Sequence, residues 1–173
     1  MRQKTEVLLY KAFMDLMRRH PFQKITIQKI ATECGVNRQT FYYHFDNIYD
    51  LMSRAFEFGL IYESRMFDED TWEGVMKRFL KWMKVNRVVM KNIITNIESR
   101  YLRQAIYPLI SQSLEEKAGT IIRANTDMDD GFARRFLIYG ITQYILEWAE
   151  SDFKEEINDI VSQMVLLLKK IYS

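Results

Sequence analysis

The feature that most restricts the fold is a stretch of about twenty residues in which two short helical patterns flank a single glycine. Thr26 is the predicted N-cap of a helix over 27–33, because its hydroxyl can accept a hydrogen bond from a backbone amide of the first turn. Gly35 follows, where a sharp turn needs a left-handed backbone that glycine adopts at almost no cost. Asn37 is the predicted cap of a second helix over 38–43. The stretch therefore predicts two short helices joined by a tight turn.

A further helix is predicted upstream, over about 4–20, with apolar residues at helical spacing on one side and Pro21 at its end. The three helices have the order of a helix-turn-helix, in which Phe41 and Phe45 pack the third helix against the other two. Its opposite side presents Arg38, Gln39, Tyr42 and Tyr43. Such side chains exchange hydrogen bonds with base edges and contact thymine methyl groups in a major groove. Spacing alone leaves an alternative, a small helical subdomain with an exposed polar face.

The rest of the chain also predicts helices, because only two prolines and six glycines interrupt its 173 residues. The expected helices cover about 47–64, 72–85, 87–97, 101–123, 132–150 and 153–171. Thr71 is the predicted cap of the second of these, Pro108 is expected to kink or interrupt the fourth, and NTDMDDG is the clearest break. We predict an all-α fold, with a three-helix DNA-binding domain over 1–47 and a linking helix and C-terminal helical domain over 48–173.

The order of residues is more specific than their spacing. In register along the chain stand Ile25-Thr26-Ile27, Ile30-Ala31, Gly35-Val36, Thr40-Phe41-Tyr42-Tyr43-His44-Phe45 and Leu51. Over about residues 5–55 this pattern resembles the DNA-binding region of TetR-family regulators. The resemblance implies a homodimeric transcription regulator, expected to be a repressor, that binds a palindromic operator in double-stranded DNA. It also implies that a small-molecule ligand or a partner protein acts on a C-terminal ligand-binding and dimerisation domain.

The resemblance assigns a role to each matching position. Base contacts are expected from Asn37, Arg38, Gln39 and Tyr42, phosphate or backbone contacts from Thr26, Gln28, Tyr43 and His44, and Thr40 belongs to the same set. One position departs from the pattern, because the family usually has a phosphate-binding lysine near the start of the fourth helix and this chain has Ile48. Lys24 and Lys29 are the candidates to replace it. The departure keeps an alternative open, a helical protein-interaction adaptor or co-activator with weakened DNA binding.

The last two predicted helices carry apolar stripes. In the final helix the stripe is Ile157, Ile160, Val161, Met164, Val165 and Leu168. It is broader than one helix needs to cover a small core, and the resemblance implies that both helices pair with their copies in a dimer, with Gly140 allowing a close approach. The alternative is that both stripes are core of a single chain. The segment 132–148 also faintly resembles regulators of the dihydroxyacetone kinase activator type, some of which act with a partner protein.

Aromatic and methionine residues of the C-terminal part are candidates for a ligand pocket, because such side chains line adaptable apolar cavities. The candidates are Trp82, Met83, Met90, Tyr101, Tyr107, Tyr139 and Tyr144. The same residue types are ordinary core in most helical proteins, which is the alternative for each of them.

Other classes of function find little support. The sequence has no nucleophile elbow, phosphate-binding glycine loop or paired-carboxylate motif, so we expect no enzyme. One cysteine and two distant histidines argue against a disulfide framework and a metal site, and no cofactor is expected. No uncharged run is long enough to span a membrane and the start lacks a signal-peptide core, so we expect a cytoplasmic protein. Eight Lys and Arg against five Asp and Glu in the first 50 residues favour phosphate contact weakly.

Overall fold

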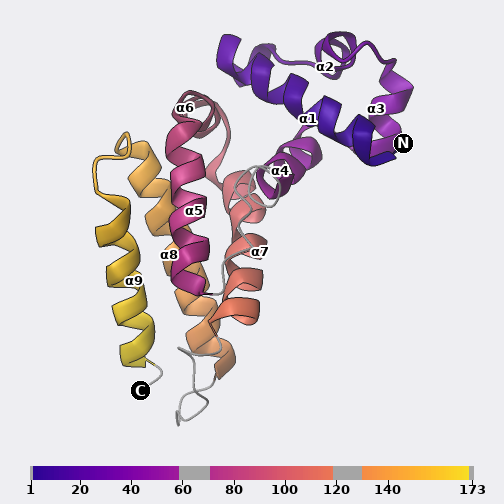
Figure 1. Ribbon diagram of the computed structural model, residues 1–173. Helices are drawn as coiled ribbons and strands as arrows, with labels where there is room; N and C mark the ends of the chain where they lie inside the picture. The colour runs from indigo at the N-terminus through magenta and orange to yellow at the C-terminus, as the bar shows by residue number, and fades with distance from the viewer. Residues whose placement is uncertain (1, 59–70, 119–129, 172–173) are drawn as a thin grey trace.

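The computed structural model describes residues 2–58, 71–118 and 130–171, and within these ranges it holds nine α-helices, one 3-10 turn and no strand (Figure 1). The elements are α1 (Arg2–Arg19), η1 (Phe22–Lys24), α2 (Ile27–Glu33), α3 (Arg38–His44), α4 (Ile48–Phe58), α5 (Trp72–Val85), α6 (Arg87–Asn96), α7 (Ser99–Lys117), α8 (Asp130–Glu150) and α9 (Ile157–Ile171). The predicted all-α fold class is confirmed, with an N-terminal helix-turn-helix and a C-terminal helical region.

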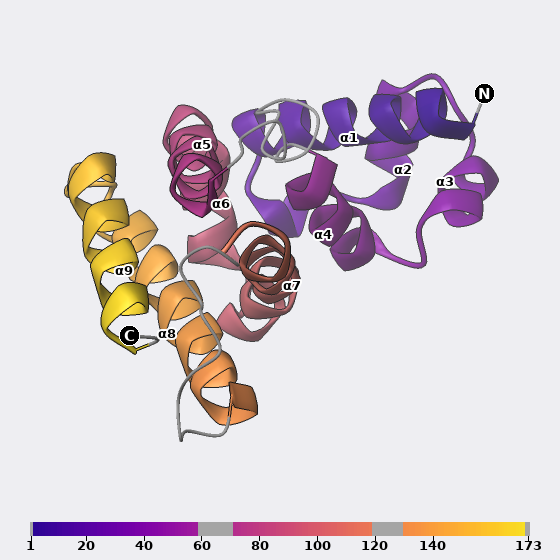
Figure 2. The ribbon, with the colours of Figure 1, turned by 60° about the horizontal axis from the view of Figure 1, so that its bottom comes forward.

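The first four helices form a group of their own, with α1 packed against α2 and α4 (Figures 1 and 2). Their contact is built on side chains that are fully buried, among them Phe13, Ile30 and Phe41. The predicted caps are confirmed: Thr26 Oγ1 accepts a hydrogen bond from Lys29 N at 3.2 Å, and Asn37 Oδ1 accepts one from Thr40 N at 2.8 Å. These bonds satisfy amides that a helix leaves unpaired at its start, which fixes where α2 and α3 begin.

The turn between α2 and α3 is as tight as its sequence predicts. Gly35 has a φ of +68°, and its amide donates to Thr32 O at 3.0 Å. Val36 N then donates to Ala31 O at 2.9 Å, which closes the end of α2. A side chain at Gly35 would strain this backbone, because residues with a Cβ rarely adopt the left-handed region. The turn sets the direction in which α3 leaves α2.

The C-terminal helices form a bundle in which α5, α7, α8 and α9 run roughly alongside one another (Figure 1). The main contacts are α7 with α8, α5 with α9 and α6 with α8, while α4 packs on α7 and α1 on α6. Trp72 is fully buried between helices, and its indole N–H donates to Ser113 Oγ at 3.2 Å. A buried indole needs such a partner, so the bond fixes α5 against α7.

Three features differ from the sequence expectation or lie outside it. α9 begins at Ile157 rather than at 153, because Asp152 and Phe153 have φ values of 63° and 61° and close a turn in which Phe153 N donates to Trp148 O at 3.0 Å. α7 continues through Pro108, so the expected interruption is wrong. The expected continuations over 59–64 and 119–123, and most of NTDMDDG, lie outside the described residues.

Candidate nucleic-acid interface

One face of α3 consists of polar and aromatic side chains that point away from the protein. Phe41 and Phe45 are buried and hold the helix in place, whereas Arg38, Gln39, Tyr42 and Tyr43 are exposed, the two tyrosines by 50% and 70%. We call these four exposed residues the recognition face. Their predicted exposure is confirmed. Two exposed tyrosines on one short helix are unusual for a surface that contacts only water, because phenol rings are largely apolar.

Arg38 and Tyr42 lie one turn apart on the recognition face and contact each other. Arg38 Nη2 donates to Tyr42 Oη at 3.4 Å, and the guanidinium carbon is 6.0 Å from the ring centroid. The ring limits the directions in which the guanidinium extends, so less side-chain freedom is lost when it binds. A guanidinium held in this way has the donors needed for the two acceptors of guanine, and the ring beside it can contact a thymine methyl group.

Asn37 and Thr40 bind each other at the start of α3. Asn37 Oδ1 accepts from Thr40 N and, at 3.0 Å, from the Thr40 hydroxyl. The Asn37 oxygen is therefore occupied by the cap, and a base contact would use its amide nitrogen. Gln28, on the exposed side of α2, donates to Thr32 Oγ1 at 3.2 Å. The Thr26 hydroxyl accepts from Lys29 N and keeps its own proton for a phosphate oxygen.

His44 lies in a position that the expected phosphate contact does not fit. Its side chain is only 3% exposed, and Nδ1 lies 3.3 Å from Glu6 Oε1 on α1. The ring of Tyr43 meets it edge-on, with centroids 5.0 Å apart. The family pattern alone cannot show this, because the covering carboxylate comes from a residue 38 positions earlier. In this structure His44 connects the beginning of α1 to the end of α3.

The start of α4 is acidic where the family pattern has a lysine. Asn47 caps the helix, with Oδ1 accepting from Tyr49 N at 2.9 Å and Asp50 N at 3.0 Å. Asp50 Oδ2 accepts from Asp46 N at 3.0 Å, and Ile48 packs partly buried against the core. Two carboxylates therefore flank the position from which the lysine is missing, and they repel phosphate. Arg54 Nε lies 4.0 Å from Asp50 Oδ1 and offsets part of this negative charge.

Basic side chains lie instead along α2 and the turn before it. Lys24 and Lys29 are exposed, and Lys29 Nζ donates to the backbone oxygen of Lys24 at 2.8 Å. This bond places the Lys29 ammonium beside η1, close to the Lys24 backbone. Lys24, Lys29 and Arg38 are exposed cations of the helix-turn-helix, a small group that fits the modest basic excess of the sequence.

The seven predicted ligand-pocket residues do not line one cavity. Trp82, Met83 and Met90 are buried in the core, and the Trp82 ring meets Phe56 of α4 at 5.9 Å. Tyr101 stacks on Tyr49 of α4, with centroids 4.3 Å apart. Trp82 and Tyr101 therefore belong to the packing between the N-terminal helices and the bundle, whereas Met83 and Met90 belong to the buried core.

The remaining three candidates lie at the surface. The rings of Tyr107 and Tyr139 are 4.9 Å apart and line an open hollow of about 400 Å³ between α7 and α8. Its other lining residues are Arg100, Arg103, Gln104 and Pro108. Tyr144 lies elsewhere, where its hydroxyl donates to Glu155 Oε2 at 2.8 Å, and this hydrogen bond raises the pKa of Tyr144.

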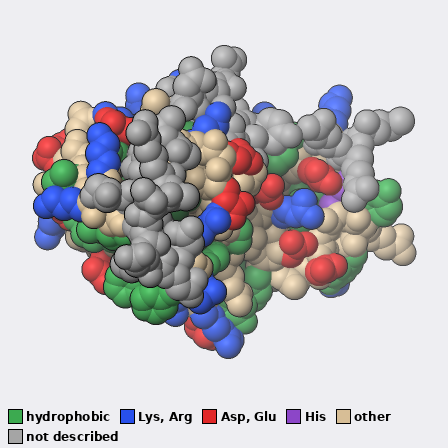
Figure 3. Space-filling model, turned by 90° about the horizontal axis from the view of Figure 1, so that it is seen from below, with side chains coloured by type: hydrophobic (Ala, Val, Ile, Leu, Met, Phe, Trp, Pro, Cys, Tyr) green, Lys and Arg blue, Asp and Glu red, His purple; other side chains and the backbone are tan. Residues whose placement is uncertain are grey.

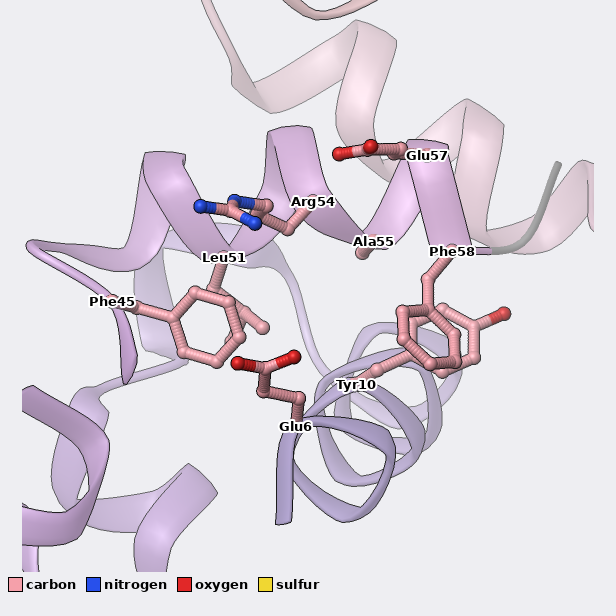
Figure 4. A pocket seen from close by; sticks show the side chains of 8 residues that line it. All are labelled: Glu6, Tyr10, Phe45, Leu51, Arg54, Ala55, Glu57 and Phe58. Carbon is pink, nitrogen blue, oxygen red and sulfur yellow. The ribbon is translucent and has the colours of Figure 1, made fainter. Parts of the chain in front are cut away.

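A second hollow, of about 140 Å³, lies within the N-terminal helices (Figure 4). Its walls come from α1, α4 and the end of α3, and Figure 4 shows the Tyr10 and Phe58 rings against each other at one end and Glu6 near Phe45 at the other. Those two rings are 5.5 Å apart. None of the ligand-pocket residues predicted from the sequence lines this hollow.

The stripe expected on α9 lies within the chain's own core. Ile160, Val161, Met164 and Leu168 are buried, and Ile157 and Val165 partly so, with α9 packed on α5. The exposed large apolar residues of α8 and α9 are instead Phe132, Phe136, Tyr139, Tyr144, Leu166 and Leu167. Figure 3 shows apolar side chains gathered on the C-terminal part of the molecule. Gly140 is also exposed, and a Cβ added there would meet nothing within 4 Å.

Cys34 packs partly buried against the core of the helix-turn-helix, in surroundings that make its thiol poorly reactive. Its thiol donates to Leu8 O at 3.4 Å. Burial, with a smaller contribution from the charge of Glu33, raises the pKa of the thiol to about 11. In the described part of the chain no three His, Cys, Asp or Glu residues are grouped so as to hold a metal ion, and none of the described helices has the length and apolar character to cross a membrane.

The thiol pKa gives a direct prediction. Only the thiolate is alkylated, and a pKa near 11 in place of 9 leaves roughly a hundredfold less thiolate at pH 8. Folded protein should therefore react with iodoacetamide about a hundredfold more slowly than urea-unfolded protein, and the rate should keep rising up to about pH 11. Mass spectrometry of timed samples measures both rates. Equal rates in the two states would show that Cys34 is accessible and unshifted.

Comparison with known proteins bears on both halves of the chain. The family described as "Bacterial regulatory proteins, tetR family" matches residues 9–55, and a "Transcriptional regulator C-terminal region" family matches residues 70–170. A curated relative, the HTH-type dhaKLM operon transcriptional activator DhaS of Lactococcus lactis subsp. lactis (strain IL1403), is 29% identical over 105 residues. That match spans 58% of this chain and 56% of the relative, so the chain covers about half of that protein.

Solved structures show the same fold. The dihydroxyacetone kinase operon activator DhaS superposes with a TM-score of 0.66 at 22% identity, covering 97% of this chain and 96% of that one. A TetR transcriptional regulator from Streptococcus agalactiae 2603V gives a TM-score of 0.66 at 21% identity, covering 96% and 94%. The arrangement of the helix-turn-helix on its helical bundle is therefore shared along nearly the whole chain.

Proposed function

The chain belongs to the TetR family of transcriptional regulators, and we propose that it is a homodimer that binds a palindromic operator through the recognition face. The observation that carries the proposal is the division of α3 into a buried aromatic side and an exposed side with Arg38, Gln39, Tyr42 and Tyr43. An exposed guanidinium, a carboxamide and two phenols together provide donors, acceptors and apolar surface for base edges.

The dimer forms, in this proposal, through the exposed side of α8 and the neighbouring exposed leucines of α9. Phe136 is 67% exposed in the single chain, and Phe132 and Tyr139 lie on the same side of α8. Gly140 lies among them and has open space where a Cβ would be. Glycine within a helix costs about 1 kcal/mol relative to alanine, and no described atom of the chain would crowd a Cβ there. In this proposal the close approach of a second copy accounts for the glycine.

A two-fold dimer presents two copies of α3, and it therefore reads two half-sites in inverted order. Helix-turn-helix dimers place these about one helical turn, roughly 34 Å, apart. The test is selection of duplexes from a random library by the full protein, followed by footprinting of the enriched sequence. An enriched inverted repeat protected in both halves is expected. Binding that stays indifferent to sequence would refute the proposal.

The acidic start of α4 supports a weaker phosphate contact than the family pattern implies. One substitution should restore the stronger contact. Ile48→Lys should raise operator affinity about three- to tenfold at low salt and steepen the dependence of log K on log salt by about 0.9 for each phosphate contacted. Ile48→Met is the matched control, because it keeps an apolar side chain of similar volume. Fluorescence anisotropy at several salt concentrations measures both effects. An unchanged slope would show that the start of α4 does not approach DNA.

The same acids favour a second candidate function, a protein-interaction adaptor with weakened DNA binding. Asp46 and Asp50 near the recognition helix oppose phosphate, and no described lysine lies at the start of α4. The two functions differ in one measurement. Specific binding of the selected duplex at about 150 mM salt supports the regulator, whereas an affinity that vanishes by that concentration supports the adaptor.

Control by a ligand or a partner protein completes the proposal. The hollow where Tyr107 and Tyr139 meet is its candidate site, and Arg100 and Arg103 beside them suit an anionic group. Thermal-shift screening of small organic acids, each repeated with Arg103→Gln, tests this placement. We further propose repression, because a dimer bound across a promoter blocks polymerase without a further contact. A reporter that rises when the regulator is deleted supports repression, and one that falls would give it the activating role that the name of DhaS states for that protein.

A further inference from the structure

The side chain of Asn92 on α6 joins the bundle to the end of α1. Asn92 Nδ2 donates to Met17 O at 2.7 Å and to His20 O at 2.6 Å, and Asn92 Oδ1 accepts from Phe22 N at 3.1 Å. These bonds connect residues about 70 positions apart in the sequence. We call this set of three hydrogen bonds the α1–α6 bridge.

The bridge binds backbone groups at the end of α1 and just after it, where the helix itself provides no hydrogen-bond partners. A helix ends with unpaired carbonyl oxygens, and Pro21 prevents the next turn from supplying their donors. The Asn92 amide takes the place of that missing turn. It cannot rotate easily, because Asn96 Nδ2 donates to both Asn92 O and Asn92 Oδ1 at 2.8 Å.

Other hydrogen bonds near the bridge also connect the N-terminal helices to the C-terminal bundle. Arg18 Nη2 donates to Asn86 Oδ1 at 3.0 Å, and Asn86 is itself buried with its amide donating to Trp82 O. Gln23 Nε2 reaches Asn96 O at 3.4 Å. The end of α1 is thus attached to the bundle by directional polar bonds, which fix an angle more narrowly than apolar contact does.

The other end of α1 is attached to the recognition helix. Glu6 on α1 faces the covered ring of His44, the last residue of α3. From Glu6 to Met17, 11 residues at about 1.5 Å each, α1 is a rigid connection of roughly 17 Å between α3 and the bridge. An angular error at Asn92 therefore becomes a displacement of the recognition face.

We propose that Asn92 is a positioning residue for DNA recognition, which sets the orientation of α3 relative to the bundle through which two copies pair. The inference rests on the proposed operator-binding dimer. Two recognition faces held at a fixed separation bind a site of one spacing and reject others, because the orientation has been fixed before binding. Without the bridge, the two recognition faces sample several separations. The dimer then distinguishes poorly between operators whose half-sites have different spacings.

The test uses Asn92→Asp in the full chain. Aspartate keeps the size of the side chain but has no N–H, and its charge is repelled by the carbonyl oxygens of Met17 and His20. Thr95→Ala is the matched control, because Thr95 is exposed on the same helix. Asn96→Ala, which only releases the Asn92 side chain, is the milder variant if Asn92→Asp does not fold. Circular dichroism establishes folding for each.

Two measurements are made on each variant. Hydrogen exchange of the Phe22 amide, followed by NMR, reports the bridge without DNA. It should accelerate at least about tenfold in an additional Asn92→Leu variant, because leucine lacks the Oδ1 acceptor that aspartate keeps. DNA affinity is then compared between the duplex selected by wild-type protein and two altered duplexes. In these, the DNA between the half-sites is one base pair longer or one base pair shorter. The wild-type preference for the original spacing should fall about tenfold in Asn92→Asp, and less in Asn96→Ala.

The outcomes separate the inference from the proposed function. Faster Phe22 exchange with an unchanged spacing preference makes the bridge merely structural and overturns the inference. Unchanged Phe22 exchange overturns the bridge itself. If wild-type protein selects no duplex at all, the proposed function fails, and the positioning role fails with it even where Phe22 exchange confirms the bonds.

Discussion

Replacing Arg38 with alanine should remove most of the preference of this protein for the proposed operator over unrelated DNA. A bidentate contact to a base is worth about 1–3 kcal/mol, and a dimer makes it twice, so the expected loss is roughly thirty-fold to ten-thousand-fold. Arg38 is exposed and contacts only Tyr42 among the described residues, so the fold should remain intact. Anisotropy with the selected duplex and a scrambled duplex measures the ratio of the two affinities.

Lys24→Ala is the control for this prediction, because Lys24 is an exposed cation outside α3. It should weaken binding to both duplexes by similar factors and reduce the salt dependence by about one phosphate contact per half-site. Arg38→Ala behaving in the same way, with both affinities falling in parallel, would show that Arg38 contacts phosphate rather than bases. The recognition face would then have to be assigned to other residues.

Local features of this fold were predictable because their causes are local. Thr26, Asn37 and Thr71 each cap a helix with a side chain that bonds an amide three residues later, and the sequence predicted all three. Gly35 has the left-handed φ that its place in the turn requires. The exposed side of α3 followed from the spacing of Phe41 and Phe45 alone.

Features that depend on distant contacts were not predictable in this way. The expected last helix began at Phe153, but the Phe153 ring packs edge-on against Trp148, at 4.8 Å, and its backbone turns the chain. His44 was assigned to phosphate, but Glu6 covers it from the start of α1. Periodicity shows that a helix has an apolar side without showing which element covers it, and so the α9 stripe was expected at a dimer contact.

The predicted pocket residues illustrate the same limit. Trp82, Met83 and Met90 are of the residue types that line ligand cavities. In the structure they fill the core, as the same residue types do in most helical proteins. The Asn92 bridge had no signal in the sequence at all. An asparagine in a helix is commonplace, and its role exists only because α6 reaches the end of α1.

Phe136→Glu should convert the proposed dimer into monomers. Two-fold symmetry places each substitution in the contact twice, and an unpaired charge buried there costs several kcal/mol per copy. Sedimentation at micromolar concentration should give the 20.9 kDa of one chain rather than twice that mass. Val88→Glu is the matched control, since Val88 is an exposed apolar residue on α6 outside this face, and it should stay dimeric. A dimeric Phe136→Glu protein would place the interface elsewhere.

Gly140→Leu gives a sharper test, because it should change the fold and the dimer in opposite directions. Within one chain a Cβ there meets no described atom within 4 Å, and leucine replaces a poor helix former, so the monomer should gain about 0.5–1 kcal/mol. Across a close helix contact the same side chain forces the two copies apart and raises the dimer dissociation constant. Urea unfolding of the Phe136→Glu monomer, with and without Gly140→Leu, isolates the first effect. Sedimentation of the single Gly140→Leu variant measures the second, and a dimer as tight as wild type would remove Gly140 from the interface.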